Sequence, residues 1–176
     1  MVKQMAIIKA YHAGGTDEIE KFLLGSLYIK QSYNDNNWLG NGLYFWENDS
    51  RRAENWQIQK GKGSILECEI DTGDLLNLLE DNDEAAGFFT NARSLSDRHR
   101  ATHSNNKATQ RFALDCKIFN VLKTDFQTRF AGVRMAFYLG ESASENGNLY
   151  TDQHIQVCLW DLSVIQNPKK HIPCEW

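Results

Sequence analysis

The segment at residues 38–56, WLGNGLYFWENDSRRAENW, restricts the possible folds of this chain more than any other stretch. Gly40 and Gly42 favour a tight turn, because glycine adopts positive φ angles without steric cost. The apolar run at residues 43–46 has the length and aromatic content of a short buried strand. A polar Asn-Asp-Ser break then suits the start of a helix that carries Trp56. The segment predicts a turn, a strand and a helix in direct succession.

Two aromatic side chains, Tyr44 and Trp56, flank this predicted corner. They could form two walls of a slot for a flat ring, and the glycines of the turn would let a ligand come close to the backbone. Aromatic residues in short strands and helices are also common core residues. On this segment alone both interpretations stay open.

Size and composition indicate a single domain over residues 1–176. A chain of 176 residues with 41% apolar residues can bury a substantial core. It has no run of roughly 18 apolar residues that could span a membrane, and its start lacks the apolar segment of a secretion signal. The net charge of −4 argues weakly against broad, sequence-independent binding to nucleic acid. We therefore expect a cytoplasmic protein with no membrane partner.

The cysteines form no pattern that predicts a metal site or a disulfide framework. There is no Cys-x-x-Cys pair and no paired histidine spacing among Cys68, Cys116, Cys158 and Cys174. They are typical of small core residues in a reduced protein. We expect no metal.

Apolar periodicity predicts an α+β domain of short strands with interspersed helices. Further strands are expected at residues 5–12, 27–29, 64–70, 132–139 and 154–162. Helices are expected at residues 17–24, after residue 49 and at 107–123, with a helical turn at 74–79. Asp17 and Glu20 suit a capping box for the first helix. No regular strand–helix alternation or glycine-rich phosphate loop occurs, which argues against a Rossmann domain.

Residues 81–106 are expected to form a long polar insertion, acidic at its start and basic from Arg93 onward. We expect mostly loop, with a helix near residues 84–92. A long connection inside a compact domain is often functional, and a solvated insertion without a function is the alternative.

Three elements occur in an order that resembles a known superfamily. His12 ends the first predicted strand, a Gly-x-Gly-Leu-Tyr-Phe element follows at residues 40–45, and Gln156 lies on the last predicted strand. Over residues 7–165 this order resembles the ADP-ribosyltransferase superfamily, in the branch of diphtheria toxin and poly(ADP-ribose) polymerase. The resemblance implies a split, mostly antiparallel β-sheet core with flanking helices, and a pocket for NAD⁺.

The resemblance also implies a role for each residue of that pocket. His12 would hydrogen-bond a ribose hydroxyl, for which imidazole suits because it can donate and accept at once. Ala13, followed by Gly14, stands where the family has a glycine whose backbone holds the nicotinamide carboxamide. Tyr44 would stack on the nicotinamide ring and Trp56 would close the other side.

Two positions depart from the family pattern. Ala53 stands where the family often has a carboxamide-binding serine. Gln156 stands where the family has a glutamate that stabilises positive charge developing on the ribose. Glutamine can accept a hydrogen bond but carries no charge, which argues against polymer synthesis. Glu141 and Glu145, in the loop expected before the last strand, could supply a carboxylate, or could be solvated loop residues.

The function that the resemblance implies is mono-ADP-ribosyl transfer from NAD⁺ to a macromolecular acceptor. NAD⁺ hydrolysis, in which water replaces the acceptor, is one alternative. A catalytically inactive module that binds NAD⁺ or ADP-ribose is another. The RNA 2′-phosphotransferases share the fold, but the arginine and histidine set on which they depend has no match here.

The acceptor stays open between a protein and RNA or DNA. Arg and His side chains at residues 93–111 could bind phosphates near the cleft. A compact domain of this superfamily is similar to toxins and defence effectors of bacteria and phages. This similarity implies a possible neutralising antitoxin as a partner.

Overall fold

The computed structural model describes residues 6–26, 28–34, 37–102, 109–142 and 150–173, with backbone alone at 99–102, 109–112, 139–142 and 150–151. Its elements are, in chain order, β1 (Ile7–Gly14), α1 (Thr16–Leu23), β2 (Leu43–Glu47), α2 (Ser50–Lys60), β3 (Ser64–Asp71), the 3₁₀ turn η1 (Thr72–Asp74), β4 (Leu75–Asn77), α3 (Asp83–Thr102), α4 (Thr109–Phe126), β5 (Gly132–Ser142), β6 (Tyr150–Leu159), the 3₁₀ turn η2 (Leu162–Val164) and β7 (Gln166–Lys170).

The strands form one seven-stranded sheet in the order β4-β5-β6-β2-β1-β3-β7. Only the β4–β5 pair is parallel, and the other neighbours run antiparallel. The predicted α+β class with a mostly antiparallel sheet is therefore confirmed. The order brings β1, β2 and β6 side by side, although β6 lies more than a hundred residues after β2 in the chain.

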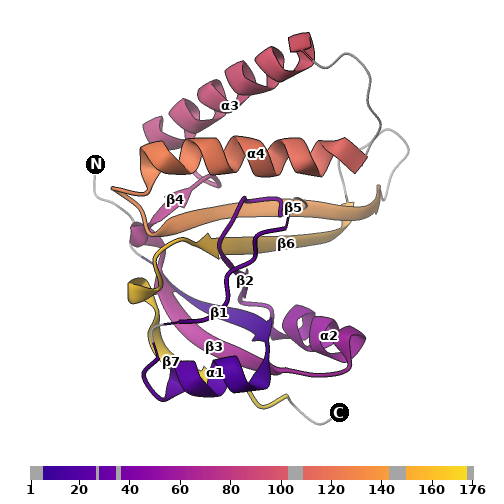
Figure 1. Ribbon diagram of the computed structural model, residues 1–176. Coiled ribbons are helices and arrows are strands. Elements are labelled where there is room, and N and C mark those ends of the chain that lie inside the picture. The colour runs from indigo at the N-terminus through magenta and orange to yellow at the C-terminus, as the bar shows by residue number, and fades with distance from the viewer. Residues whose placement is uncertain (1–5, 27, 35–36, 103–108, 143–149, 174–176) are drawn as a thin grey trace.

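The helices gather at the two ends of this sheet (Figure 1). α4 lies over β5 and β6 with α3 on its outer side, while α1 and α2 lie beside β1, β3 and β7. Figure 1 also shows the chain between α1 and β2 running from one end toward the other. β2 therefore sits where the two halves meet.

The packing of apolar side chains follows this division. One core cluster joins the sheet to α1 and contains Ile19 and Phe45, both at most 1% exposed. A second joins the sheet to α3 and α4 through rings that include Phe88 and Phe119. A small third cluster under α2 contains Ala53. Burying each large side chain stabilises the fold by about 1.5–3 kcal/mol relative to leaving it exposed.

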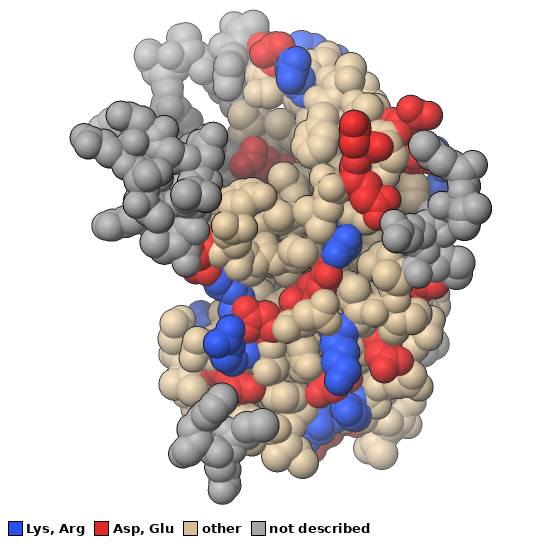
Figure 2. Space-filling model, turned by 180° about the vertical axis from the view of Figure 1, so that it is seen from behind, with Lys and Arg blue, Asp and Glu red and all other residues tan. Residues whose placement is uncertain are grey.

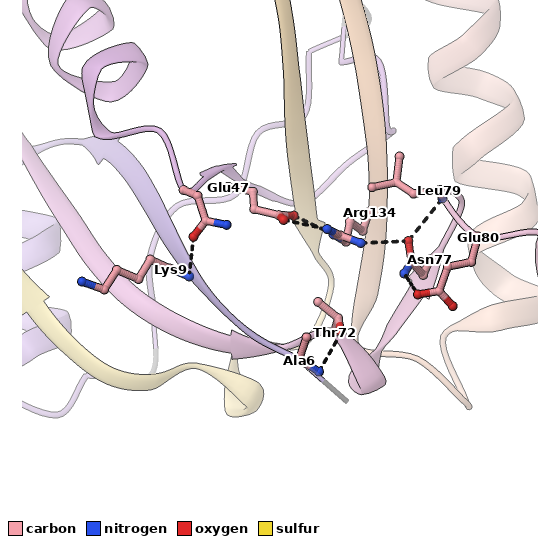
Figure 3. Close-up of polar contacts among 9 residues, drawn as sticks. Ala6, Lys9, Glu47, Thr72, Asn77, Leu79, Glu80 and Arg134 are labelled. Atoms are coloured by element: carbon pink, nitrogen blue, oxygen red, sulfur yellow. Dashed lines mark hydrogen bonds and ion pairs between the residues drawn. The ribbon is translucent and has the colours of Figure 1, made fainter. Parts of the chain in front are cut away.

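A buried ion pair ties β2 to β5 across β6 (Figure 3). The Arg134 guanidinium donates to both carboxylate oxygens of Glu47, at 2.6 Å each. It also donates to Asn77 Oδ1 on β4 at 3.3 Å, and Asn77 in turn donates to Glu80 at 2.6 Å. Both charged side chains are largely buried, at 15% and 5% exposed. Losing either partner would leave a buried charge uncompensated.

The expectation of a mostly loop insertion at residues 81–106 is wrong where the structure describes it. α3 extends over Asp83–Thr102, well beyond the predicted helix at 84–92. Ala85, Phe88, Ala92 and Leu95 repeat at helical spacing and pack in the second core cluster. The many charged residues of this segment concealed that repeat, because they occupy the outward face.

Other expected boundaries also need correction. No strand forms at residues 28–29, the described part of the expected strand, although Ile29 is buried. β5 and β6 run into the expected loop at 140–153, because pairing in a long hairpin satisfies the backbone of polar residues too. The expected capping box at Asp17 is absent: Gly15 is the N-cap of α1, and no side chain caps it.

Candidate functional site

A cavity of about 670 Å³ opens where β1, β2 and β6 meet. Glu18 of α1, segment 30–34 with residues 37–38, and Trp56 of α2 complete its wall. Its size lies in the range of roughly 300–1,000 Å³ that is typical of ligand pockets. The six residues to which the resemblance assigned a place in the pocket all line this one cavity: His12, Ala13, Gly14, Tyr44, Trp56 and Gln156.

The His12 ring is fixed by its hydrogen bond to the neighbouring strand. Its Nδ1 lies 2.8 Å from the carbonyl oxygen of Tyr44. Because a carbonyl oxygen can only accept, Nδ1 carries the proton, and Nε2 of the neutral ring is an acceptor. Burial lowers the pKa of His12, against the opposing effect of the Tyr44 carbonyl. A neutral imidazole with a free acceptor nitrogen can accept from a ligand hydroxyl.

Gly14 makes room for that ring. A Cβ on Gly14 would lie 2.7 Å from His12 Nε2, which is closer than real Cβ contacts come, and 3.2 Å from its Cδ2, which is tighter than most. The side chain of Ala13 is instead buried against α2, beside Ala53. Ala53 itself is fully buried and is not among the described residues that line the cavity. Residue 53 therefore offers no hydrogen-bonding side chain to a ligand in the cavity.

Tyr44 joins the cavity wall to the turn before β2. Its hydroxyl donates to the Gly40 carbonyl at 2.7 Å and accepts from the Leu39 N–H at 2.9 Å. Burial is the main cause that raises the pKa of Tyr44, and the nearby Cys158 adds to it. The hydroxyl is therefore committed to the backbone, which leaves the ring as the part that can contact a ligand.

Asn120 of α4 supports the same turn from outside, and sequence analysis did not find it. Its Oδ1 accepts from the Asn41 N–H at 2.7 Å. Gly40 adopts a φ of +76° beneath it, where a Cβ would lie 2.7 Å from Asn120 Oδ1. Nothing local in the sequence of α4 points to this contact, because Asn120 is separated from its partner by 79 positions.

The rim of the cavity carries aromatic and charged side chains. Trp56 is 39% exposed, and Lys60 Nζ lies 5.2 Å from the centre of its ring. Trp38 also lines the cavity and packs on Phe137 at 4.8 Å between ring centres. Aromatic rings at the mouth of a cavity suit a planar ligand.

The charged groups of the cavity are few. Among the described lining residues, Lys30 is the one basic side chain and Glu18 the one acidic side chain. Sequence analysis did not select either of them. The carboxylates it considered, Glu141 and Glu145, fall outside the described side chains. Glu18, in the first turn of α1, is therefore the carboxylate that the described structure offers to a ligand in this cavity.

Gln156 lies on β6 opposite Trp46 of β2. Its amide nitrogen is 2.8 Å from Nε2 of His154, two residues earlier on the same strand. Burial, and then the charge of Arg52, lower the pKa of His154 to about 4, against the opposing effect of Asp49. His154 is therefore neutral at physiological pH and accepts the amide hydrogen.

The basic segment expected near the cleft lies elsewhere as far as the structure describes it. Arg93 and Arg98 are on α3, which packs on α4 and adds no described side chain to the cavity wall. Figure 2 shows the molecule from behind the view of Figure 1, and there lysines and arginines are interspersed with acidic residues. The described residues of that face form no broad basic patch of the kind that binds nucleic acid.

Comparisons with models of protein families, with curated proteins and with solved structures find no match to this chain. Among the described residues, no group of three or more His, Cys, Asp and Glu side chains could hold a metal ion. In the same part of the chain, no helix is both long enough and apolar enough to cross a membrane. Cys68, Cys116 and Cys158 are buried, as expected of small core residues, and form no disulfide within the described part of the chain.

Proposed function

We propose that the chain is a mono-ADP-ribosyltransferase that uses NAD⁺, and that its sheet is the split sheet of the ADP-ribosyltransferase fold. The observation that carries the proposal is the convergence of His12, Tyr44, Trp56 and Gln156 on one cavity from four different elements. The order of motifs in the sequence predicts these residues without reference to their positions in space. Unrelated surface residues spread over so much of the chain would rarely meet in this way.

The reaction would cleave the bond between C1′ of the ribose and the nicotinamide nitrogen. Nicotinamide leaves with the bonding electron pair, and an oxygen or nitrogen of the acceptor bonds to C1′ and loses its proton. Positive charge develops on the ribose during this step, as in glycoside hydrolysis. Groups that hold the ring and stabilise this charge accelerate the reaction.

Each wall of the cavity suits one part of NAD⁺. The rings of Tyr44 and Trp56 would contact the nicotinamide, and His12 Nε2 would accept from a ribose hydroxyl. Lys30 at the opening would pair with the pyrophosphate. Glu18 would provide negative charge that Gln156 cannot. The acceptor is a macromolecule, protein or nucleic acid, for which the open rim leaves room.

The test is nicotinamide release from NAD⁺ by the purified chain, followed by chromatography. We expect release, and we expect His12→Ala and Tyr44→Ala to abolish it while circular dichroism stays unchanged. Tyr28→Ala is the matched control, because Tyr28 is 70% exposed and is not among the lining residues. Unchanged release in either site variant would refute the site.

A second experiment separates transfer from the alternatives. NAD⁺ labelled with ³²P in the adenylate is incubated with the protein and a cell extract. Label that becomes sensitive to protease or to nuclease identifies a protein or a nucleic-acid acceptor. Release of nicotinamide without labelled macromolecule would indicate a glycohydrolase. Binding of NAD⁺ without release would indicate a binding module.

A further inference from the structure

We infer that His154 is a positioning residue that holds the Gln156 amide in one orientation, with its nitrogen on the imidazole and its oxygen directed to the cavity. The inference rests on the proposed function. It explains how Gln156, which stands where the family has a glutamate, could still stabilise charge on the ribose. His154 acts through Gln156 rather than on the substrate, because it is not among the described residues that line the cavity.

The contact itself requires a particular tautomer. The amide nitrogen of Gln156 can only donate, so His154 Nε2, 2.8 Å away, must accept. His154 therefore carries its proton on Nδ1. An imidazolium has no lone pair for this bond, so the contact exists only while His154 is neutral.

The surroundings of His154 keep the ring neutral and in place. The residue is 7% exposed and stacks on Phe137 of β5, with ring centres 5.8 Å apart. The charge of Arg52 of α2 acts on His154, and Arg52 is itself paired with Asp152 and Asp49. A nearby guanidinium and burial both disfavour a second positive charge.

Within the described part of the chain, His154 makes no second hydrogen bond that would give it a purely structural role. Its Nδ1 is buried and has no partner among the described residues. A buried donor without a partner destabilises a protein, so stability alone does not account for a histidine here. The one described hydrogen bond of the ring goes to Gln156, a residue of the cavity wall.

The orientation matters because the two ends of an amide have opposite polarity. Without His154, the Gln156 side chain could turn its NH₂ group toward the cavity and repel developing positive charge. With the nitrogen held, the oxygen accepts from a ribose hydroxyl and presents the negative end of its dipole.

The test uses nicotinamide release with two variants of similar size. We expect His154→Phe, which cannot accept, to lower kcat by about tenfold, the worth of one hydrogen bond, with little change in KM. His154→Gln, whose carbonyl can accept, restores most of the rate. In a Gln156→Ala background, His154→Phe should have no further effect. Additive losses, or equal loss in both His154 variants, would overturn the inference.

A measurement without NAD⁺ keeps the two proposals distinguishable. ¹⁵N NMR of the imidazole should show the proton on Nδ1, with an Nε2 signal that changes in Gln156→Ala. A proton on Nε2, or an unchanged signal, refutes the positioning role whatever the activity. Absence of nicotinamide release by the unmodified protein, with the expected tautomer present, would refute the proposed function and leave the contact intact.

Discussion

Replacing Gly14 with alanine adds one methyl group to the wall of the cavity. The new Cβ would lie 2.7 Å from His12 Nε2, whereas ordinary carbon contacts are at roughly 3.5–4.0 Å. Gly14 is not among the glycines with a positive φ, so its backbone accepts alanine without strain. The imidazole must therefore move by about 1 Å. That movement stretches or breaks its 2.8 Å contact with the Tyr44 carbonyl.

The expected effects on stability and on activity differ widely. Losing the His12 hydrogen bond costs about 0.5–1.5 kcal/mol, and alanine offsets about 0.4–1 kcal/mol by restricting the unfolded chain. The net change in the free energy of unfolding is then below about 1 kcal/mol. Displacing a contact group by about 1 Å can lower the rate by about a hundredfold. We expect that loss in kcat/KM for nicotinamide release.

Gly15→Ala is the matched control for this variant. A Cβ on Gly15 would meet Glu18 at 3.7 Å, an ordinary contact, and would lie away from the His12 ring. Urea unfolding and nicotinamide release are measured for both variants. Full activity in Gly14→Ala, or an equal loss of activity in Gly15→Ala, would refute the view that a glycine is needed at position 14 to leave room for the His12 ring.

Three further predictions follow from contacts around the site and the sheet. Tyr44→Phe keeps the ring but leaves two backbone groups of the turn without their partner, so urea unfolding should show a loss of about 1–3 kcal/mol, with more activity left than in Tyr44→Ala. Arg134→Met leaves the buried Glu47 carboxylate without its ion-pair partner and should lower the free energy of unfolding by about 3–5 kcal/mol. Adding Glu47→Leu should recover most of this loss. An equal loss in the double variant would contradict the ion-pair argument. Burial raises the pKa of Glu67, but hydrogen bonds from His171 and a neighbouring lysine outweigh burial and lower the pKa below its ordinary value of 4.5. The stability that this carboxylate adds is therefore complete above pH 4.5 and is lost as the pH falls through the lower folded pKa, so Glu67→Gln should flatten the acid side of a plot of melting temperature against pH.

Local sequence predicted the elements whose pattern repeats within one element. The strand and helix of segment 38–56 appear as β2 and α2, and the alternation at residues 64–70 appears as β3. Periodicity reports which side of a strand or helix is buried, and that information lies within a few consecutive residues. Periodicity did not predict the full length of α3, because charged residues on its outward face obscured the regular spacing of its buried apolar residues. It also did not predict the polar ends of β5 and β6, which pair through their backbones.

For the candidate site, the sequence predicted several of the residues, but only the tertiary structure shows which side chains they contact. His12, Tyr44 and Gln156 were selected from motif order, but nothing in the sequence showed that Gln156 binds His154. Likewise, nothing in the sequence showed that Glu18 lines the cavity.

What the sequence by itself determined is the α+β class and most of the elements that form the cavity. Only tertiary structure decided which acid faces the cavity, which side chains hold the turn before β2, and which atom of Gln156 is free. The physical reason is that these are contacts between distant segments: Asn41 and Asn120 are 79 positions apart. Such contacts depend on sheet order and strand register, which no local pattern encodes.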